Sequence, residues 1–151
     1  MKWWVYAVGI IFSIILEITP FVKYLEIRGI KPDLFLIILV FFSLKKGSLK
    51  GEIMGFFIGI FEDLVSSGVF GINSFSKTIC GFLVGKSKEK ILHENFISQI
   101  IIMLSISLLN GLLVYLIRCL FTTPSGFIVV PLETCYNTLL SIPIFILFRK
   151  L

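Results

Sequence analysis

Six predominantly apolar runs divide the chain, and they constrain its fold more than any other feature of the sequence. The runs cover residues 3–22, 32–44, 51–67, 71–85, 96–120 and 131–148. An α-helix needs about 20 apolar residues to cross the hydrocarbon core of a bilayer, and the first, fifth and sixth runs are long enough. We therefore predict an all-α integral membrane protein in which residues 1–151 form a single transmembrane domain of six spanning helices.

The composition indicates that this chain folds in a bilayer rather than in water. Of 151 residues, 57% are apolar and only 15% are charged, whereas soluble domains keep roughly a quarter of their residues charged. Folded in water, such a chain would expose an apolar surface and aggregate. The net charge of +5 is spread over small clusters between the runs, so we expect no nucleic-acid partner.

The three runs from residue 32 to residue 85 are short for spanning helices. Pro32 suits the first position of a helix, and Asp33 complements the positive end of the helix dipole. The run at 32–44 needs help from the residues before it or from local thinning of the bilayer. A five-span arrangement, which would put the C-terminus outside, stays open as an alternative.

Lysine and arginine residues fall unevenly on the two sides of the predicted bundle. With the N-terminus inside, the cytoplasmic set is Lys2, Lys45, Lys46, Lys50, Lys86, Lys88, Lys90, Arg149 and Lys150. The opposite side carries the smaller set Lys23, Arg28, Lys31 and Arg118. Because Lys and Arg favour the cytoplasmic side, we predict that both termini are cytoplasmic. We expect the basic clusters to meet anionic lipids, or only to anchor the topology.

Glycines recur with a spacing of four residues in two neighbouring runs. Gly51, Gly55 and Gly59 stack on one face of the third predicted helix, and Gly81 and Gly85 do so on the fourth. Small residues on one face let another backbone approach closely, which is how helices associate in lipid. The two stripes predict an antiparallel hairpin, and the first stripe is a candidate surface for a partner helix. Packing within the chain alone is the alternative.

Three ionisable residues lie inside the third and fourth runs. Each costs about 3 kcal/mol at the bilayer centre on insertion scales. Glu62 and Asp63 lie near the outer end of their run, and Lys77 lies at a similar depth in the next run. We hypothesise that Lys77 pairs with Asp63, with Glu62 as a second partner. Separate snorkelling of each side chain to the interface is the alternative.

Under the predicted topology, polar residues from several runs gather in the outer half of the membrane. This outer polar cluster consists of Glu17, Glu62, Asp63, Lys77, Glu133 and Asn137. Convergence of so many polar groups predicts a cavity or a partner groove that opens outward. Scattered snorkelling at the interface is again the alternative.

No constellation of residues points to catalysis. His93 stands beside Glu94 in a charged loop, where a solvated histidine is expected. Cys80, Cys119 and Cys135 lie in apolar runs without a CxxC pair or a nearby histidine, which argues against a disulfide or a metal site. We therefore expect no enzyme activity, no metal and no cofactor.

The stretch from Pro32 to Gly85 resembles a known family. Its features in order are Pro32-Asp33-Leu34 opening an apolar run, the basic turn Lys45-Lys46-Gly47, the series Gly51, Gly55, Gly59 and Asp63, and then Gly71-Ile72-Asn73. This order resembles the rod shape-determining protein MreD family. The family motif corresponds to Pro32, Asp33, Gly71 and Asn73, whereas Glu62 and Lys77 are less typical of it.

The resemblance implies a non-enzymatic subunit of the bacterial cell-elongation complex in the cytoplasmic membrane. Such a subunit maintains cell shape by supporting lateral peptidoglycan synthesis through binding of MreC. Indirect partners would be the actin-like MreB, the RodA glycosyltransferase and a penicillin-binding transpeptidase. The implied fold is similar to the six-helix substrate-binding (S) component of energy-coupling factor transporters. That similarity supplies an alternative function, a vitamin-binding component of a membrane transporter.

Overall fold

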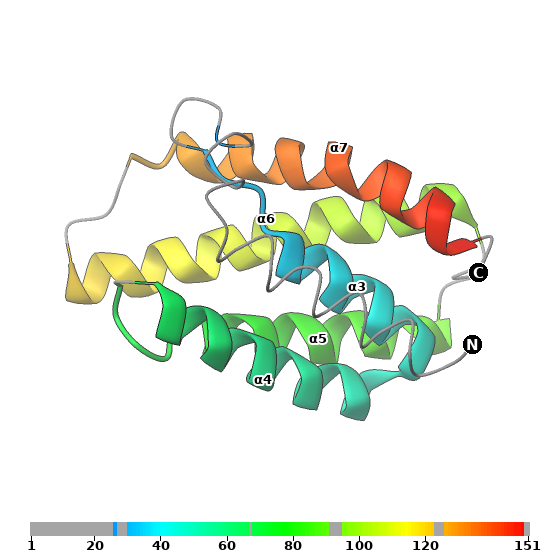
Figure 1. The fold of residues 1–151 in the computed structure, drawn as a ribbon, viewed down its shortest axis with the longest axis horizontal. Helices are drawn as coiled ribbons and strands as arrows, with labels where there is room; N and C mark the ends of the chain where they lie inside the picture. Colours follow the sequence, from blue (N-terminus) through cyan, green and yellow to red (C-terminus); the bar gives the residue numbers. More distant parts are fainter. Residues whose placement is uncertain (1–25, 27–29, 67, 91–94, 123–125, 150–151) are drawn as a thin grey trace.

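A computed structural model describes residues 26, 30–66, 68–90, 95–122 and 126–149 of the chain. Its elements are α-helices: α3 (Leu34–Lys46), α4 (Ser48–Val65), α5 (Ile72–Lys90), α6 (Phe96–Phe121) and α7 (Val129–Arg149). Successive helices run in alternate directions (Figure 1). The predicted first span, residues 3–22, and Glu17 lie outside the described residues. The fold is therefore all-α as predicted, but five helices are described and the predicted count of six is not supported.

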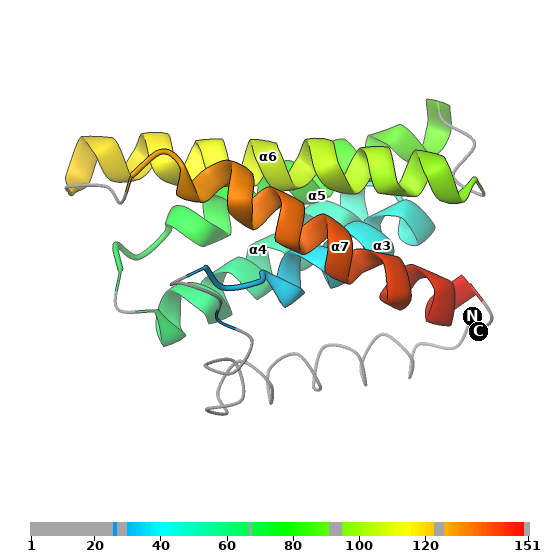
Figure 2. The same ribbon diagram turned by 90° about the horizontal axis from the view of Figure 1, so that it is seen from above.

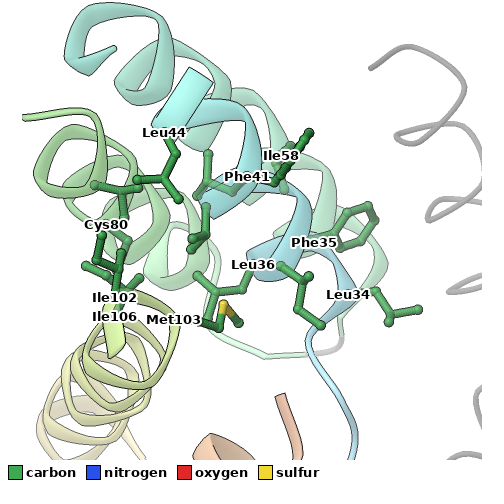
Figure 3. Packing of buried hydrophobic residues seen from close by; sticks show 14 of the residues in the cluster. Leu34, Phe35, Leu36, Phe41, Leu44, Ile58, Cys80, Ile102, Met103 and Ile106 are labelled. Atoms are coloured by element: carbon green, nitrogen blue, oxygen red, sulfur yellow. The ribbon is translucent and has the colours of Figure 1, made fainter. Parts of the chain in front are cut away.

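The α3 helix is the shortest of these helices and is buried on nearly all sides. Leu36, Leu39 and Val40 are fully buried. Figure 3 shows the α3 side chains among residues from the neighbouring helices, such as Cys80 of α5 and Met103 of α6. The 13 residues of α3 rise only about 20 Å, less than the thickness of a hydrocarbon core. Because protein surrounds this helix, its backbone ends are shielded from lipid and a short helix is tolerated.

The α4 and α5 helices form a hairpin in which backbone lies against backbone. A Cβ added to Gly51, Gly55 or Gly59 would collide with backbone atoms of α5, and one added to Gly81 or Gly85 would collide with backbone atoms of α4. The two stripes thus face each other, and the predicted antiparallel hairpin is confirmed. The prediction that the first stripe lies open to a partner helix is wrong in this structure, because α5 already fills that face.

Two of the described helices are long and apolar enough to cross a membrane. They are α6 and residues 129–146 of α7, judged by length and composition. The end of α6 lies near the beginning of α7, and the two helices cross obliquely (Figure 2). Gly111 of α6 meets the side chain of Val130 rather than a backbone, so the two helices are separated by side chains where the hairpin is not.

Apolar side chains cover the outside of the bundle, and polar side chains lie within it. Exposed large apolar residues occur on α4 through α7, among them Phe57, Leu64, Ile97, Leu120 and Leu139. The buried polar residues are Ser43, Asp63, Asn73, Ser74, Ser76, Lys77, Ser107, Asn110, Thr134, Asn137, Thr138 and Ser141. This distribution is typical of a protein whose surface meets lipid, because lipid does not penalise exposed apolar groups.

Candidate functional site

A cluster of charged and amide side chains lies toward the end of the bundle where α4 and α6 end and α5 and α7 begin (at the left in Figure 1). Its principal members are Asp33, Glu62, Asp63, Lys77 and Asn137, and each has a hydrogen bond within the cluster or to a helix end next to it. Residues from the loop before α3 and from α4, α5 and α7 therefore meet at one place. Three of these four elements belong to the runs 32–44, 51–67 and 71–85, which are the shortest apolar runs among the described residues.

Lys77 is the centre of the cluster. Its side chain is 0% exposed, and its Nζ donates to Oδ2 of Asp33 at 2.8 Å and also to Oε2 of Glu62. A buried ammonium needs such partners because an isolated charge in an apolar medium is very costly. Snorkelling of Lys77 is therefore excluded, and its ion pair with Glu62 is confirmed. Its main predicted partner, Asp63, is wrong, because Asp33 takes that place.

Asp63 does not bind Lys77 but caps the beginning of α5. Its carboxylate accepts the backbone N–H groups of Gly71, Asn73 and Ser74, each at 3.0 Å, and the hydroxyl of Ser74 at 2.7 Å. These donors belong to the free amide groups that every helix start leaves unpaired. A carboxylate is also favoured there by the positive end of the helix dipole. Gly71 turns the chain toward Asp63 with a φ of 100°, in the left-handed region that favours glycine.

Glu62 and Asp63 separate because neighbouring residues of a helix point in directions about 100° apart. Glu62 therefore reaches Lys77 within the body of α5, while Asp63 reaches the first turn of the same helix. The membrane depth inferred from the sequence placed both carboxylates at the level of Lys77. It carried no information on which face of α4 each carboxylate would occupy.

Asp33 connects three elements through three different groups. Its Oδ1 accepts the N–H of Leu36 at 2.8 Å and so caps α3, while its Oδ2 accepts from Lys77 of α5. Its backbone N–H donates to Oδ1 of Asn137 on α7 at 2.7 Å. The family-motif residue Asp33 was predicted only to complement a helix dipole; its position opposite Lys77 had no signal in the sequence, because the two lie 44 residues apart.

A polar seam continues from this cluster between α6 and its neighbours. Nδ2 of Asn137 donates to the hydroxyl of Ser107 at 3.0 Å, and the hydroxyl of Ser76 donates to Oδ1 of Asn110 at 2.7 Å. Ser76, Ser107 and Asn110 were not among the predicted site residues. The spacing of Ser107 and Asn110 on one side of their run was a signal for them, since polar groups in lipid tend to bond across helices.

The remaining predicted residues fall as follows. Glu133 is half-buried on α7, within electrostatic range of Asp33, Lys77 and Arg118. Pro32 is buried directly before the cap of α3, and Asn73 is buried at the start of α5. The structure thus gathers the motif residues and the described part of the outer polar cluster into one site. Glu17 is not among the described residues.

The opposite end of the bundle is basic. Lys45, Lys50 and Lys86 are exposed there, and Nζ of Lys88 donates to the carbonyl oxygen of Lys45 at 2.8 Å, which ties the end of α5 to the end of α3. A cation suits this position because the C-terminal end of a helix is its negative pole. The described bundle therefore has an acid-rich end and a lysine-rich end.

This arrangement can hold helices together and can present carboxylates, but it provides little else chemically. Among the described residues, no group of three or more His, Cys, Asp or Glu side chains is placed to bind a metal ion. Over the same residues, every buried side-chain nitrogen or oxygen has a hydrogen-bond partner. Apolar outer faces around a paired polar interior, together with two helices of spanning length, define an all-helical membrane protein.

The sequence comparison gives the family. Residues 1–151, the whole chain, match the family model of the rod shape-determining protein MreD. The chain belongs to that family, whose members are shape-determining membrane proteins rather than known enzymes. No curated protein and no solved structure matches the chain. Family membership suggests a role in determining rod shape.

Proposed function

We propose that the protein is a non-enzymatic scaffold or regulatory subunit of the membrane complex that maintains rod shape in a bacterium. It would support lateral peptidoglycan synthesis by binding MreC, and through MreC it would act with MreB, RodA and a penicillin-binding transpeptidase. The observation that carries this proposal is the family match over residues 1–151. The buried polar side chains of the described residues support a role in assembly, because each has a hydrogen-bond partner within the protein.

We further propose six spanning helices in a single domain, similar to the S-component fold, with residues 3–22 as the first span and both termini in the cytoplasm. The separation of charge along the bundle supports this orientation. Exposed lysines such as Lys45, Lys50 and Lys86 lie at one end, and the carboxylates lie toward the other. Lysines near anionic headgroups gain about 1 kcal/mol each, so the basic end would also bind such lipids.

The partner surface has to be sought away from the glycine stripe, since α5 covers it. We propose that MreC contacts the outer end of the bundle, where the side chain of Asp33 is 18% exposed and Glu133 is half-buried. These carboxylates offer charge to an approaching partner without disturbing the packed core. Charges at the edge of an interface affect partner choice and association rate more than affinity.

The vitamin-binding alternative has less support. A ligand cavity needs polar groups that are free to contact the ligand. In the described part of the chain, the polar groups of this region bond to one another: Asp63 to the start of α5, Lys77 to two carboxylates, and Asn137 to Ser107. The family match also names a shape-determining protein and not a transporter.

Co-purification tests the proposal directly. We expect that the tagged protein, extracted from native membranes, recovers MreC, and that depleting the protein makes rod-shaped cells round. Glu133→Gln at the outer end should reduce MreC recovery severalfold at normal protein level. Glu52→Gln, which alters a half-buried acid near the basic end of α4, is the matched control and should not. Absence of MreC together with unchanged cell shape after depletion would refute the proposed function.

A further inference from the structure

The group of Asp33, Glu62 and Lys77 contains two acids and one base. Both carboxylates accept hydrogen bonds from the same ammonium of Lys77. If both acids were ionised, the group would carry one surplus negative charge. Asp63 does not change this balance, because its charge is met by the N–H groups that begin α5 and not by Lys77.

The surroundings of the group, so far as the described residues show them, do not supply a second base. The other titratable groups near it are Asp63 of α4, Cys80 of α5, Arg118 of α6 and Glu133 of α7. Of these only Arg118 is a base, and its charge acts on Glu133, so the two oppose each other. Cys80 is fully buried, and its thiol contributes no cation. Within the described part of the chain, the surplus charge thus remains with the group.

A surplus charge in a largely buried group is costly, and a titratable group usually avoids the cost by changing its protonation state. Two carboxylates that share one site meet the same difficulty, because one of them resists ionisation while the other is charged. One proton bound to the group would make it neutral overall, with one ammonium, one carboxylate and one carboxylic acid.

The helix ends decide which acid takes the proton. Asp33 lies at the positive, N-terminal end of α3, where its Oδ1 already accepts the N–H of Leu36. Glu62 lies in the last turn of α4, where its own carbonyl oxygen accepts from Ser66 at the helix end. The negative end of the α4 dipole disfavours a second negative charge there.

We propose that Glu62 is a neutral carboxylic acid in the folded protein, so that the Asp33–Lys77–Glu62 group is a proton-binding site. Oε2 of Glu62 accepts from Lys77 and therefore acts as the carbonyl oxygen, and the proton belongs on Oε1. The site joins the loop before α3 to α4 and α5, so the proton becomes part of what holds these elements together. Neither MreC nor any other partner is needed for it.

Stability should depend on pH in a defined direction. At neutral pH the unfolded chain would release this proton, because a solvated glutamate is ionised. The folded state then binds more protons than the unfolded state, and stability falls as the pH rises. Replacing Glu62 with Gln removes the proton site while keeping a carbonyl oxygen for Lys77, so it should remove this part of the pH dependence.

The experiment uses the full chain in lipid nanodiscs and combines infrared spectroscopy with thermal unfolding. We expect a protonated-carboxyl band in the wild type at neutral pH that is absent from Glu62→Gln and unchanged in Glu52→Gln. The unfolding temperature of Glu62→Gln should stay within a few degrees of wild type, roughly a loss below 1 kcal/mol. Asp33→Asn should lower it by on the order of 10 °C, because it removes the ionised partner of a buried lysine.

The proposal is wrong if the wild type lacks the band, if Glu62→Gln retains it, or if Glu62→Gln loses as much stability as Asp33→Asn. The last result would mean that Glu62 is an anion balanced by a cation from elsewhere in the chain. If Asp33→Asn does not fold, the band in wild type and Glu62→Gln and the pH profiles of these two proteins decide the question by themselves.

Discussion

The α4–α5 hairpin and the α6–α7 pair achieve helix packing by different physical means. In the hairpin, glycines bring the two backbones into contact, and carboxylates of α4 bond to Lys77 and to the start of α5. In the pair, long apolar helices cross obliquely, and Gly111 meets only the side chain of Val130. The hairpin therefore has little freedom to adjust, whereas side chains between α6 and α7 can shift to absorb a change.

The contrast separates two properties that hydropathy treats as one. Apolar length identifies helices that suit lipid, and by this measure α6 and α7 stand out among the described helices. Close packing depends instead on small residues and on polar groups with partners, because lipid provides no hydrophobic drive for helices to associate. The less apolar hairpin accordingly contains the closest backbone contacts and the buried charges.

The largest expected effect tests whether buried charge is specific to the hairpin. Lys77→Met should destabilise the protein by about 3–5 kcal/mol, because it leaves Asp33 without its buried counter-charge. Lys86→Met on the same helix removes an exposed lysine and should cost no more than about 0.5 kcal/mol. Chemical denaturation in detergent measures both; equal losses would show that the buried ion pairs are not important for stability.

The second prediction compares one substitution in both regions. Gly55→Ala places a Cβ against the carbonyl of Lys77, where only backbone movement can relieve the collision, so we expect a loss of about 3 kcal/mol. Gly111→Ala meets a side-chain methyl group of Val130 rather than a backbone atom and gains helix propensity, so its net effect should stay within about 1 kcal/mol. Thermal unfolding of the two variants in one detergent measures both stability losses. A larger loss for Gly111→Ala than for Gly55→Ala would contradict the contrast between the two regions.

The third prediction concerns the helix start that Asp63 holds. Asp63→Asn keeps one acceptor oxygen but turns an NH₂ group toward backbone donors, so we expect a loss of about 2 kcal/mol. Hydrogen exchange should increase first at Asn73 and Ser74, whose N–H groups lose the carboxylate. Glu52→Gln serves as the control on the same helix. Unchanged protection at these two amides would contradict the capping role.

The smallest effect belongs to the seam between α6 and α7. A double-mutant cycle of Ser107→Ala and Asn137→Ala should give a coupling of about 0.6 kcal/mol, typical of hydrogen bonds between helices in membranes. A coupling of several kcal/mol would remove the contrast between the regions, since it would make the seam as strongly held as the hairpin.

Much of the fold could be predicted from the sequence. Helices occur at all five of the described apolar runs, and the glycine spacing led to the hairpin between α4 and α5. These features are local, because apolar runs and a four-residue spacing act through the geometry of a single helix. Glu62 was also predicted as the second partner of Lys77, since both lie at a similar depth on helices joined by a short turn, whereas the first predicted partner, Asp63, was wrong.

The rest of the site depended on contacts between distant parts of the chain. Asp33 lies opposite Lys77 only because the short α3 helix is placed at the centre of the bundle. Its bond to Asn137 joins residues 104 positions apart, and no periodicity within one helix can reveal such a neighbour. The use of Asp63 as a cap for α5 was also missed, because the depth of a residue does not define the face of the helix on which it lies.

Sequence alone was enough to predict that this chain forms apolar helices for a membrane, that two of them pack through glycines, and that the ionisable residues of these two helices lie at a similar depth. Each of these properties follows from residue spacing along a single helix and from the energetics of lipid. The folded bundle was needed to show that α5 fills the glycine stripe, that Asp33 and Glu62 share Lys77, and that Asp63 caps the start of α5. Those choices depend on the relative rotation of packed helices, which is a property of the whole bundle.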